Sequence, residues 1–397
     1  MAVFFIIKIF EGGRKMEKII RKAIFVLMSI FMLVGCGEKE NSEKDSVIKI
    51  GGMGPLTGSA AMYGITIENG AKLAFEEINK NGGVLGKKLE YISLDEKADP
   101  VEAVNAYNRL IDEGVSAIIG SVTSKPTLAI AELAAQDGIP MITPTGTQVN
   151  ITDAGPNIFR VCFTDPYQGG TLATFAKEKL NAKTAAVMIN NSSDYSNGIA
   201  EEFIKQANKL GIKIVAKEGY SDGDKDFKAQ LTKIKIEDPD VLMVPEYYEQ
   251  SALIATQARE VGLKSTFIGP DGWDGVVNVL DSSSYSIVDN TYFTNHYSAE
   301  DKSEKIQDFL KKYREKYNEE PTAFSGLAYD AVYILKDAIE KAGTTEKEKL
   351  VAAIKESDMD GVTGHLTFDE KNNPIKAVTI IKIINGKYVF DSVIENK

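Results

Sequence analysis

The chain has 397 residues, enough for two domains, and a formal net charge of −11. An acidic protein is repelled by the phosphates of nucleic acid and by anionic lipid headgroups, so we expect no nucleic-acid partner. Two cysteines and two histidines leave almost no material for a metal centre or a catalytic triad. We therefore expect no bound metal, no cofactor and no enzymatic activity.

The first 35 residues have the form of a secretion signal, and the fold prediction leaves them out. A basic group precedes an apolar run, Ala23 to Val34, that is too short to span a bilayer comfortably. The basic residues are Lys18, Arg21 and Lys22. Because Met16 begins a complete signal by itself, the start of translation is either Met1 or Met16.

Leu33-Val34-Gly35-Cys36 ends this signal on a cysteine, and the stretch resembles the lipobox of bacterial lipoproteins. The resemblance implies that Cys36 is lipidated and anchors the mature chain outside the cytoplasmic membrane, at the cell surface or in the periplasm. Residues 36–46 are polar and predict a flexible tether. The alternatives are an uncleaved membrane helix and an ordinary signal with a chance cysteine.

The mature chain is more acidic than the whole chain. Residues 1–35 carry six Lys/Arg and two Asp/Glu, so their removal takes the net charge to −15. An anchor rather than charge must then hold the protein at the membrane. With Cys36 lipidated, Cys162 has no partner for an intramolecular disulfide, and its apolar neighbours favour a buried strand position over a reactive role.

From residue 47 onward, short apolar strands alternate with helices, which is typical of parallel, doubly wound α/β sheets. The expected strands of a first run are Val47–Ile50, Leu89–Leu94, Val115–Ile119 and Pro140–Thr143. One helix presents an apolar face formed by Ile67, Ala71, Ala74, Phe75 and Ile78, and another covers Thr127–Gln136. A third helix begins at Asp99-Pro100. Its expected buried stripe is Val101, Val104, Leu110 and Ile111.

The same alternation restarts after Thr164, so the sequence predicts two lobes. The expected strands of this second run are Thr184–Ile189, Ile212–Ala216, Val241–Val244 and Thr266–Ile268. The expected helices are Gly170–Leu180, Ile199–Leu210, Phe227–Ile234 and Ser251–Val261.

The last third contains helices with few strands between them. The expected helices are Ile306–Tyr317, Gly326–Lys341 and Lys347–Glu356; strands Leu366–Asp369 and Val378–Ile384 follow, with a hairpin turn at Asn385-Gly386. Helices without a sheet of their own must pack on one already built, so we expect the chain to return to the first lobe and then to the second. This predicts residues 47–164 plus 294–358 as lobe one and 165–293 plus 359–397 as lobe two.

The loops that follow the strands are candidate binding segments, because ligands of open parallel sheets bind beyond the carboxyl ends of the strands. In the first run, residues 120–127 and 144–147 are rich in hydroxyls and glycine, which suits a carboxylate. In the second run, three such loops offer acids and aromatic rings. These residues are Asp194, Glu246, Asp271, Asp274, Tyr195, Tyr247 and Trp273. Together the two walls suit a zwitterion such as an α-amino acid, although helix capping and turn formation explain each loop singly.

The chain resembles the branched-chain amino acid type of extracytoplasmic solute-binding protein, the receptor of an ABC importer. The landmarks that carry the resemblance are Gly54-Pro55-Leu56-Thr57-Gly58, Asp99-Pro100, Pro140-Met141-Ile142-Thr143-Pro144, Asp194-Tyr195, Gly269-Pro270-Asp271-Gly272 and Gly364-His365-Leu366-Thr367-Phe368-Asp369. The resemblance implies the periplasmic binding protein type I fold, in which two α/β lobes close on a ligand by hinge motion. Three crossing segments join the lobes, near Thr164, Tyr292–Asn295 and Asp358–Gly361.

The resemblance also implies the roles of eight residues in an amino acid site. Ser124, Thr145 and Thr147 match the positions that hold the α-carboxylate. Asp271 matches the acid that pairs with the α-ammonium, with help from Tyr195. The positions that line the side-chain pocket are Tyr63, Tyr247 and Phe324. The best-known members carry glutamate where this chain has Asp271, and a cysteine pair near the position of Thr123 that this chain lacks.

The expected function is capture of a branched-chain or other apolar amino acid and its delivery to a membrane permease by a monomeric receptor. One alternative is a sensor that passes the ligand signal to a membrane partner. A second is a surface hydrolase that uses Asp271 and Asp274 as paired acids. A third is an amide, urea or nucleoside ligand on the same fold.

Overall fold

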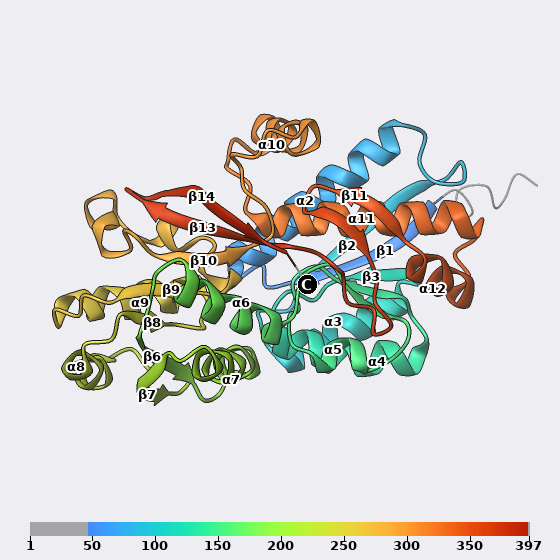
Figure 1. Cartoon of the computed structure of the whole chain (residues 1–397). Coiled ribbons are helices and arrows are strands. Elements are labelled where there is room, and N and C mark those ends of the chain that lie inside the picture. The colour runs from blue at the N-terminus through green and yellow to red at the C-terminus, as the bar shows by residue number, and fades with distance from the viewer. Residues whose placement is uncertain (1–46, 396–397) are drawn as a thin grey trace, which may run out of the picture. The chain divides into compact units, whose positions relative to one another are not determined.

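The computed structural model describes residues 47–395 (Figure 1). The signal peptide, Cys36 and the tether up to residue 46 lie outside the described residues. Within the described part of the chain, no helix is long and apolar enough to cross a membrane.

The first sheet has five strands in the order β2-β1-β3-β4-β5, and β1, β3, β4 and β5 run parallel. Its strands are β1 (Val47–Gly54), β2 (Lys88–Asp95), β3 (Ala117–Ile119), β4 (Met141–Thr143) and β5 (Ile158–Arg160). The helices of this part are α2 (Ala61–Lys80), α3 (Pro100–Asp112), α4 (Ser124–Asp137) and α5 (Asn150–Asp153). The apolar face expected for α2 is buried, as predicted.

The second sheet has seven strands in the order β14-β13-β10-β9-β8-β6-β7. Its strands are β6 (Thr184–Asn190), β7 (Lys213–Tyr220), β8 (Val241–Met243), β9 (Thr266–Gly269), β10 (Tyr292–Asn295), β13 (Val378–Ile384) and β14 (Lys387–Ile394). The α-helices and 3₁₀ helices of this part are α6 (Asp165–Glu178), α7 (Asp194–Lys209), α8 (Lys228–Glu237), α9 (Tyr248–Glu260), η2 (Asp271–Trp273), η3 (Val276–Val279) and η4 (Ser282–Ile287). Five strands are parallel, while β13 and β14 add antiparallel pairs at one edge. The mixed α/β architecture with parallel sheets confirms the predicted fold class.

The C-terminal helices pack against the helices of the first sheet, as Figure 1 shows for α11 beside α2. These helices are α10 (Glu304–Tyr317), α11 (Ala323–Ala342) and α12 (Lys347–Lys355). Strands β11 (Asp358–Gly361) and β12 (Gly364–Thr367) form a small sheet of their own, so the segment expected as a third crossing is a strand. The chain enters the seven-stranded sheet again only after residues 368–377.

Helix α3 begins as predicted, but its buried face differs from the predicted one. The Asp99 side chain accepts hydrogen bonds from the backbone N–H groups of Val101 and Glu102, which caps the helix. Val101 is 69% exposed, and only Leu110 of the expected stripe is buried. The residues that α3 buries are Ala103, Ala106, Tyr107 and Leu110. These buried residues stand at i, i+3, i+4 and i+7 from Ala103. The prediction was wrong because it began the stripe at Val101, a larger apolar residue, instead of at this small alanine.

Two smaller predictions are confirmed. Ile384 pairs with Lys387 across the hairpin, and Asn385 and Gly386 have φ values of 50° and 70°, as a tight two-residue turn between twisted strands requires. The burial expected for Cys162 is confirmed, since the residue is free and fully buried, and burial raises the pKa of its thiol to about 12. The strand position expected for it is wrong, because β5 ends at Arg160.

Candidate functional site

The loops singled out in the sequence lie at the carboxyl ends of strands from both sheets. Ser124 begins α4 after β3, Thr145 and Thr147 follow β4, and Asp271 begins η2 after β9. Tyr195 lies in the first turn of α7, and Tyr247 directly precedes α9. The remaining two expected residues are Tyr63 of α2 and Phe324 of α11. Seven of the eight side chains are buried, and that of Tyr247 is partly buried.

The hydroxyl groups of the first-sheet loops lie close to one another. The Ser124 and Thr147 hydroxyl oxygens are 3.3 Å apart. The Thr145 hydroxyl donates to the Val122 carbonyl at 2.8 Å, so this bond ties one loop to the other. Thr143 accepts from the Gly146 N–H at 2.9 Å and shapes the turn between them. The two loops therefore form one polar wall, which we call the hydroxyl wall.

Thr123 argues against the interpretation of these hydroxyls as simple helix caps. It occupies the N-cap position of α4, yet its side chain makes no capping hydrogen bond. Its hydroxyl oxygen is buried and finds no partner among residues 47–395. The first N–H groups of a 14-residue helix and their positive dipole end are thus left uncapped by this side chain, next to Ser124.

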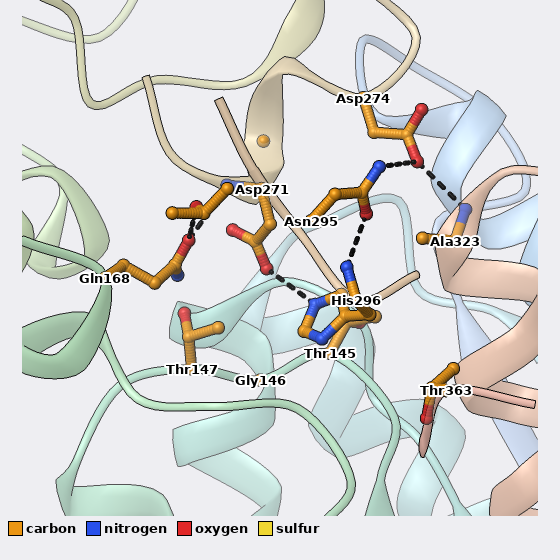
Figure 2. Close-up of polar contacts among 12 residues, drawn as sticks. Thr145, Gly146, Thr147, Gln168, Asp271, Asp274, Asn295, His296, Ala323 and Thr363 are labelled. Atoms are coloured by element: carbon orange, nitrogen blue, oxygen red, sulfur yellow. Dashed lines mark hydrogen bonds and ion pairs between the residues drawn. The ribbon is translucent and has the colours of Figure 1, made fainter. Parts of the chain in front are cut away.

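Asp271 lies at the centre of a second polar wall (Figure 2). One of its carboxylate oxygens accepts the Tyr195 O–H at 2.7 Å, and the other lies 3.4 Å from His296 Nε2. Its backbone N–H donates to the Gln168 side-chain oxygen at 2.9 Å. Figure 2 shows Thr147, Gln168 and His296 arranged around the Asp271 carboxylate.

Two functional residues in this wall were missed by the sequence prediction. Asp165 begins α6, and Gln168 follows one helical turn later on the same face. Both are buried, and both Asp165 carboxylate oxygens and the Gln168 Nε2 find no hydrogen-bond partner in the described part of the chain. The Asp165 N–H donates to the Thr147 carbonyl at 3.1 Å, which places Asp165 beside the hydroxyl wall. The available signal in the sequence was a pair of polar residues at i and i+3, on one face at the start of a helix that follows a strand.

The basic groups near these carboxylates do not neutralise them. His296 stacks on Phe163 with ring centroids 4.0 Å apart, and burial lowers its pKa to about 4, so the imidazole is uncharged at neutral pH. Arg160 donates to the Gly146 and Gln148 carbonyls, each at 2.8 Å, rather than to a carboxylate. Burial raises the pKa of Asp165 well above its usual range, with the Asp271 charge adding to the effect. The site therefore favours a cationic group.

An aromatic cluster lies beside the two polar walls. The Tyr63 ring is 4.8 Å from Phe324 and 5.8 Å from Tyr247, and Tyr247 stacks on Tyr195 at 4.8 Å. The Tyr63 hydroxyl donates to the Gly272 carbonyl and accepts the Tyr248 N–H at 3.1 Å. Tyr63 belongs to α2, so these bonds join the helices of one sheet to the loops of the other.

Asp274 does not pair with Asp271 as the hydrolase hypothesis requires. Figure 2 shows the Asp274 carboxylate beside Asn295 and Ala323, apart from the Asp271 carboxylate. Its oxygen accepts the Ala323 N–H at 2.9 Å and the Asn295 amide at 3.3 Å. Burial raises the pKa of Asp274 to about 6. These bonds give Asp274 a structural role in holding the start of α11.

Residues 47–387, the great majority of the described chain, match the family described as periplasmic binding protein. This chain belongs to that family. The match confirms the family resemblance seen in the sequence.

Known periplasmic binding proteins resemble this one over most of their length. The leucine-, isoleucine-, valine-, threonine- and alanine-binding protein of Pseudomonas aeruginosa is 34% identical over 330 residues, which cover 82% of this chain and 87% of that protein. A Leu/Ile/Val-binding protein of Rhizobium johnstonii is also 34% identical, with 81% of this chain and 88% of that protein covered.

Solved structures of this family share the fold. A leucine-binding protein from Thermotoga maritima has a TM-score of 0.81 and 36% identity, and the match covers 88% of this chain and 99% of that chain. The branched-chain amino acid transporter substrate-binding protein of Streptococcus pneumoniae, solved with isoleucine, has a TM-score of 0.81 and 35% identity, with 88% and 100% covered.

A cavity of about 280 Å³ opens at the candidate site of this periplasmic binding protein. Ser124, Tyr195 and Tyr247 line it together with Thr123, whereas the other five expected residues do not. Small-molecule pockets usually enclose roughly 300–1,000 Å³, so this cavity suits a ligand of amino acid size. Larger cavities of about 670 and 850 Å³ lie elsewhere, so the convergence of buried polar groups, not volume, identifies the candidate site.

Proposed function

We propose that this protein is the extracytoplasmic receptor of an ABC importer and binds an apolar α-amino acid between its two sheets. The observation that carries the proposal is the pair Asp165 and Gln168, whose buried polar atoms lack partners beside Asp271 and Thr147. Buried polar groups without partners are costly. A ligand ammonium can donate to the Asp165 carboxylate, and a ligand carboxylate can accept from the Gln168 Nε2 amide.

In this proposal each polar wall binds one end of the ligand. Ser124, Thr145 and Thr147 hold the α-carboxylate with hydroxyl and backbone groups near the N-terminus of α4. Asp271 pairs with the α-ammonium, and the Tyr195 hydroxyl orients the Asp271 carboxylate. Each charge of the zwitterion is then compensated inside the protein, which a buried ligand requires.

The aromatic cluster selects the ligand side chain. The Tyr63 ring lies 5.8 Å from the Tyr247 ring and 4.8 Å from the Phe324 ring, between their centroids, so the three residues offer neighbouring apolar ring faces. This lining suits a ligand with a branched-chain or other apolar side chain. The relatives in Pseudomonas aeruginosa and Rhizobium johnstonii are named for binding such amino acids.

Capture works by closure of two lobes. We assign residues 47–164 plus 294–358 to one lobe and 165–293 plus 359–397 to the other, with the ligand between them. The carboxylate site belongs to the first lobe and Asp271 to the second, so the closed form gains its full set of ligand contacts only when ligand is present. The receptor acts as a binding protein and does not convert its ligand.

The receptor delivers its ligand to an ABC permease in the membrane. Cys36 carries the lipid anchor, and the tether that follows lets a monomeric receptor reach the permease from outside the cytoplasmic membrane. The sensor alternative uses the same cleft and differs only in the membrane partner that receives the closed form.

Replacement of Asp271 by alanine tests the site. Because Asp271→Ala leaves the ligand ammonium without its counter-charge, leucine binding measured by calorimetry should fall at least about a hundredfold. Asp281→Ala is the control, since Asp281 is an exposed acid outside the cavity lining and should change affinity less than about threefold. Unchanged leucine affinity in Asp271→Ala contradicts the site assignment.

A further inference from the structure

A second cavity of about 670 Å³ lies where the chain passes between the two sheets. Four stretches of the chain line it: residues 296–302, 362–365 and 375–379, and the part of β14 and its C-terminal end that carries Phe390, Val393 and Glu395. None of the eight expected site residues lines this cavity. Its volume is within the range of small-molecule binding sites.

Lys376 is a buried cation in the wall of this cavity. Its side chain is only 6% exposed, and its ammonium donates to the Thr363 hydroxyl at 2.9 Å. That hydroxyl donates in turn to the Asp330 carboxylate at 2.7 Å, so Thr363 separates the two charges. Among residues 47–395 the Lys376 ammonium has no other hydrogen-bond acceptor, although it carries three N–H donors.

Lys376 faces the counter-charge of Asp330 through the Thr363 hydroxyl rather than directly. Asp330 also accepts the Val362 and Thr363 N–H groups, at 2.7 and 2.8 Å, so its carboxylate is largely occupied. Burial lowers the pKa of Lys376 to about 8, against the opposing charge of Asp330, which leaves the group mainly protonated at neutral pH. A buried, protonated ammonium with free donors favours an anionic ligand.

One part of the cavity wall is apolar and exposed. Ile375, Phe390 and Val393 are 52%, 45% and 47% exposed, and all three line the cavity. They are three of the nine large hydrophobic side chains that stand exposed in the described chain, and a cluster of this kind marks a binding surface. Buried Ile306 and Val362 continue the apolar wall inward.

Acidic residues on the same wall limit the charge of the ligand. Glu300, Asp301 and Glu395 line the cavity together with Lys302. Glu300 accepts the Phe390 N–H and Asp301 accepts the Ser303 N–H, each at 2.8 Å. These carboxylates disfavour a ligand with more than one negative charge.

We propose that this cavity binds a small organic monocarboxylate with an apolar body. The carboxylate pairs with the Lys376 ammonium, and the apolar body covers Ile375, Phe390 and Val393. This site is separate from the amino acid cleft, although His296 contributes to both, as it lines this cavity and bonds Asp271.

Three probes with the same six-carbon chain test the proposal: hexanoate, hexan-1-ol and hexylamine. Calorimetry is run with saturating leucine, and again on Asp271→Ala without leucine, so that the cleft is either filled or disabled. We expect saturable hexanoate binding in both settings, with hexan-1-ol at least about tenfold weaker and no binding of hexylamine. Displacement of hexanoate by leucine, or equal affinities for hexanoate and hexan-1-ol, overturns the proposal.

Two variants test the contribution of the Lys376 charge and that of the cavity space one at a time. Lys376→Met keeps the stem and removes the charge, so hexanoate affinity should fall about tenfold or more. Lys387→Met, at the exposed start of β14 and outside the cavity lining, should leave it nearly unchanged. Val393→Trp places a large side chain in the cavity from the half-exposed position of Val393 on β14, so it should abolish hexanoate binding. This variant still tests the proposal if Lys376→Met does not fold. Wild-type affinity in both Lys376→Met and Val393→Trp overturns the proposal.

Discussion

At the scale of single residues, this protein is defined by buried carboxylates without cationic partners. Asp165 and Asp271 lie together, while Arg160 binds carbonyl groups and His296 is uncharged at neutral pH. Such groups destabilise the folded chain when they ionise, because burial disfavours the charged form. A cationic ligand group would remove this penalty. The carboxylates that lower the stability of the folded chain are therefore the ones that the proposed ligand contacts.

Glu96 allows this effect to be measured outside the candidate site. One of its oxygens accepts the Ser121 hydroxyl at 3.0 Å and the other is buried without a partner in the described chain. Burial raises the pKa of Glu96 to about 7, so the folded state holds its proton more tightly than the unfolded state. Its contribution to stability is therefore complete below about pH 4.5 and is lost as the pH rises through about 7.

Glu96→Gln should remove this pH dependence. The variant cannot ionise, so its stability relative to wild type should rise between pH 5 and pH 8, by on the order of 2–3 kcal/mol. Urea unfolding at both pH values measures the difference. The exposed Glu90 offers a control, since Glu90→Gln should give the same small difference at both values. A pH-independent difference for Glu96→Gln contradicts the prediction.

At the scale of elements, helix ends and helix faces follow different rules. The start of α3 depends on local chemistry, because Asp99 bonds the N–H groups of its own first turn. The buried face of α3 depends on which residues the sheet covers. Ala103 and Leu110 lie on that face and Val101 does not, although valine is the more hydrophobic choice in the first turn.

A pair of alanine substitutions in α3 tests the corrected face. Leu110→Ala removes a fully buried side chain and should lower the free energy of unfolding by about 2–5 kcal/mol. Val101→Ala is the matched control at the expected but exposed position, and it should change that free energy by less than about 0.5 kcal/mol. Chemical denaturation of both variants decides between the two faces; equal losses support the original stripe.

At the scale of the whole molecule, the proposed ligand binding depends on contacts between segments of both sheets. Tyr63 of α2 is the clearest of these, since its hydroxyl bonds Gly272 and Tyr248 of the other half. These contacts exist only when the two halves are together. The energy of closure is thus shared between the ligand and a few direct bonds.

Tyr63→Phe should weaken leucine binding without unfolding the chain. It keeps the ring but loses two hydrogen bonds that join the halves, so leucine affinity should fall about tenfold. Leucine should still reduce the radius of gyration measured by X-ray scattering, but at higher concentration than in wild type. Tyr317→Phe loses a bond of 2.9 Å to the Asn69 carbonyl within one half and should bind leucine normally. Equal affinities in the two variants contradict this role of Tyr63.

The alternation of strands and helices determined the fold class, since hydrophobic periodicity and helix caps are local properties that the residues carry with them. The strand-end loops with Ser124, Thr147 and Asp271 were found for the same reason: parallel strands place their carboxyl ends at one edge. Asp165 and Gln168 were missed because polar residues in a helix are usually exposed, and only the packing of α6 buries them. The cavity at Lys376 likewise exists only in the tertiary structure, because the folded chain brings together its walls from four separate stretches of sequence.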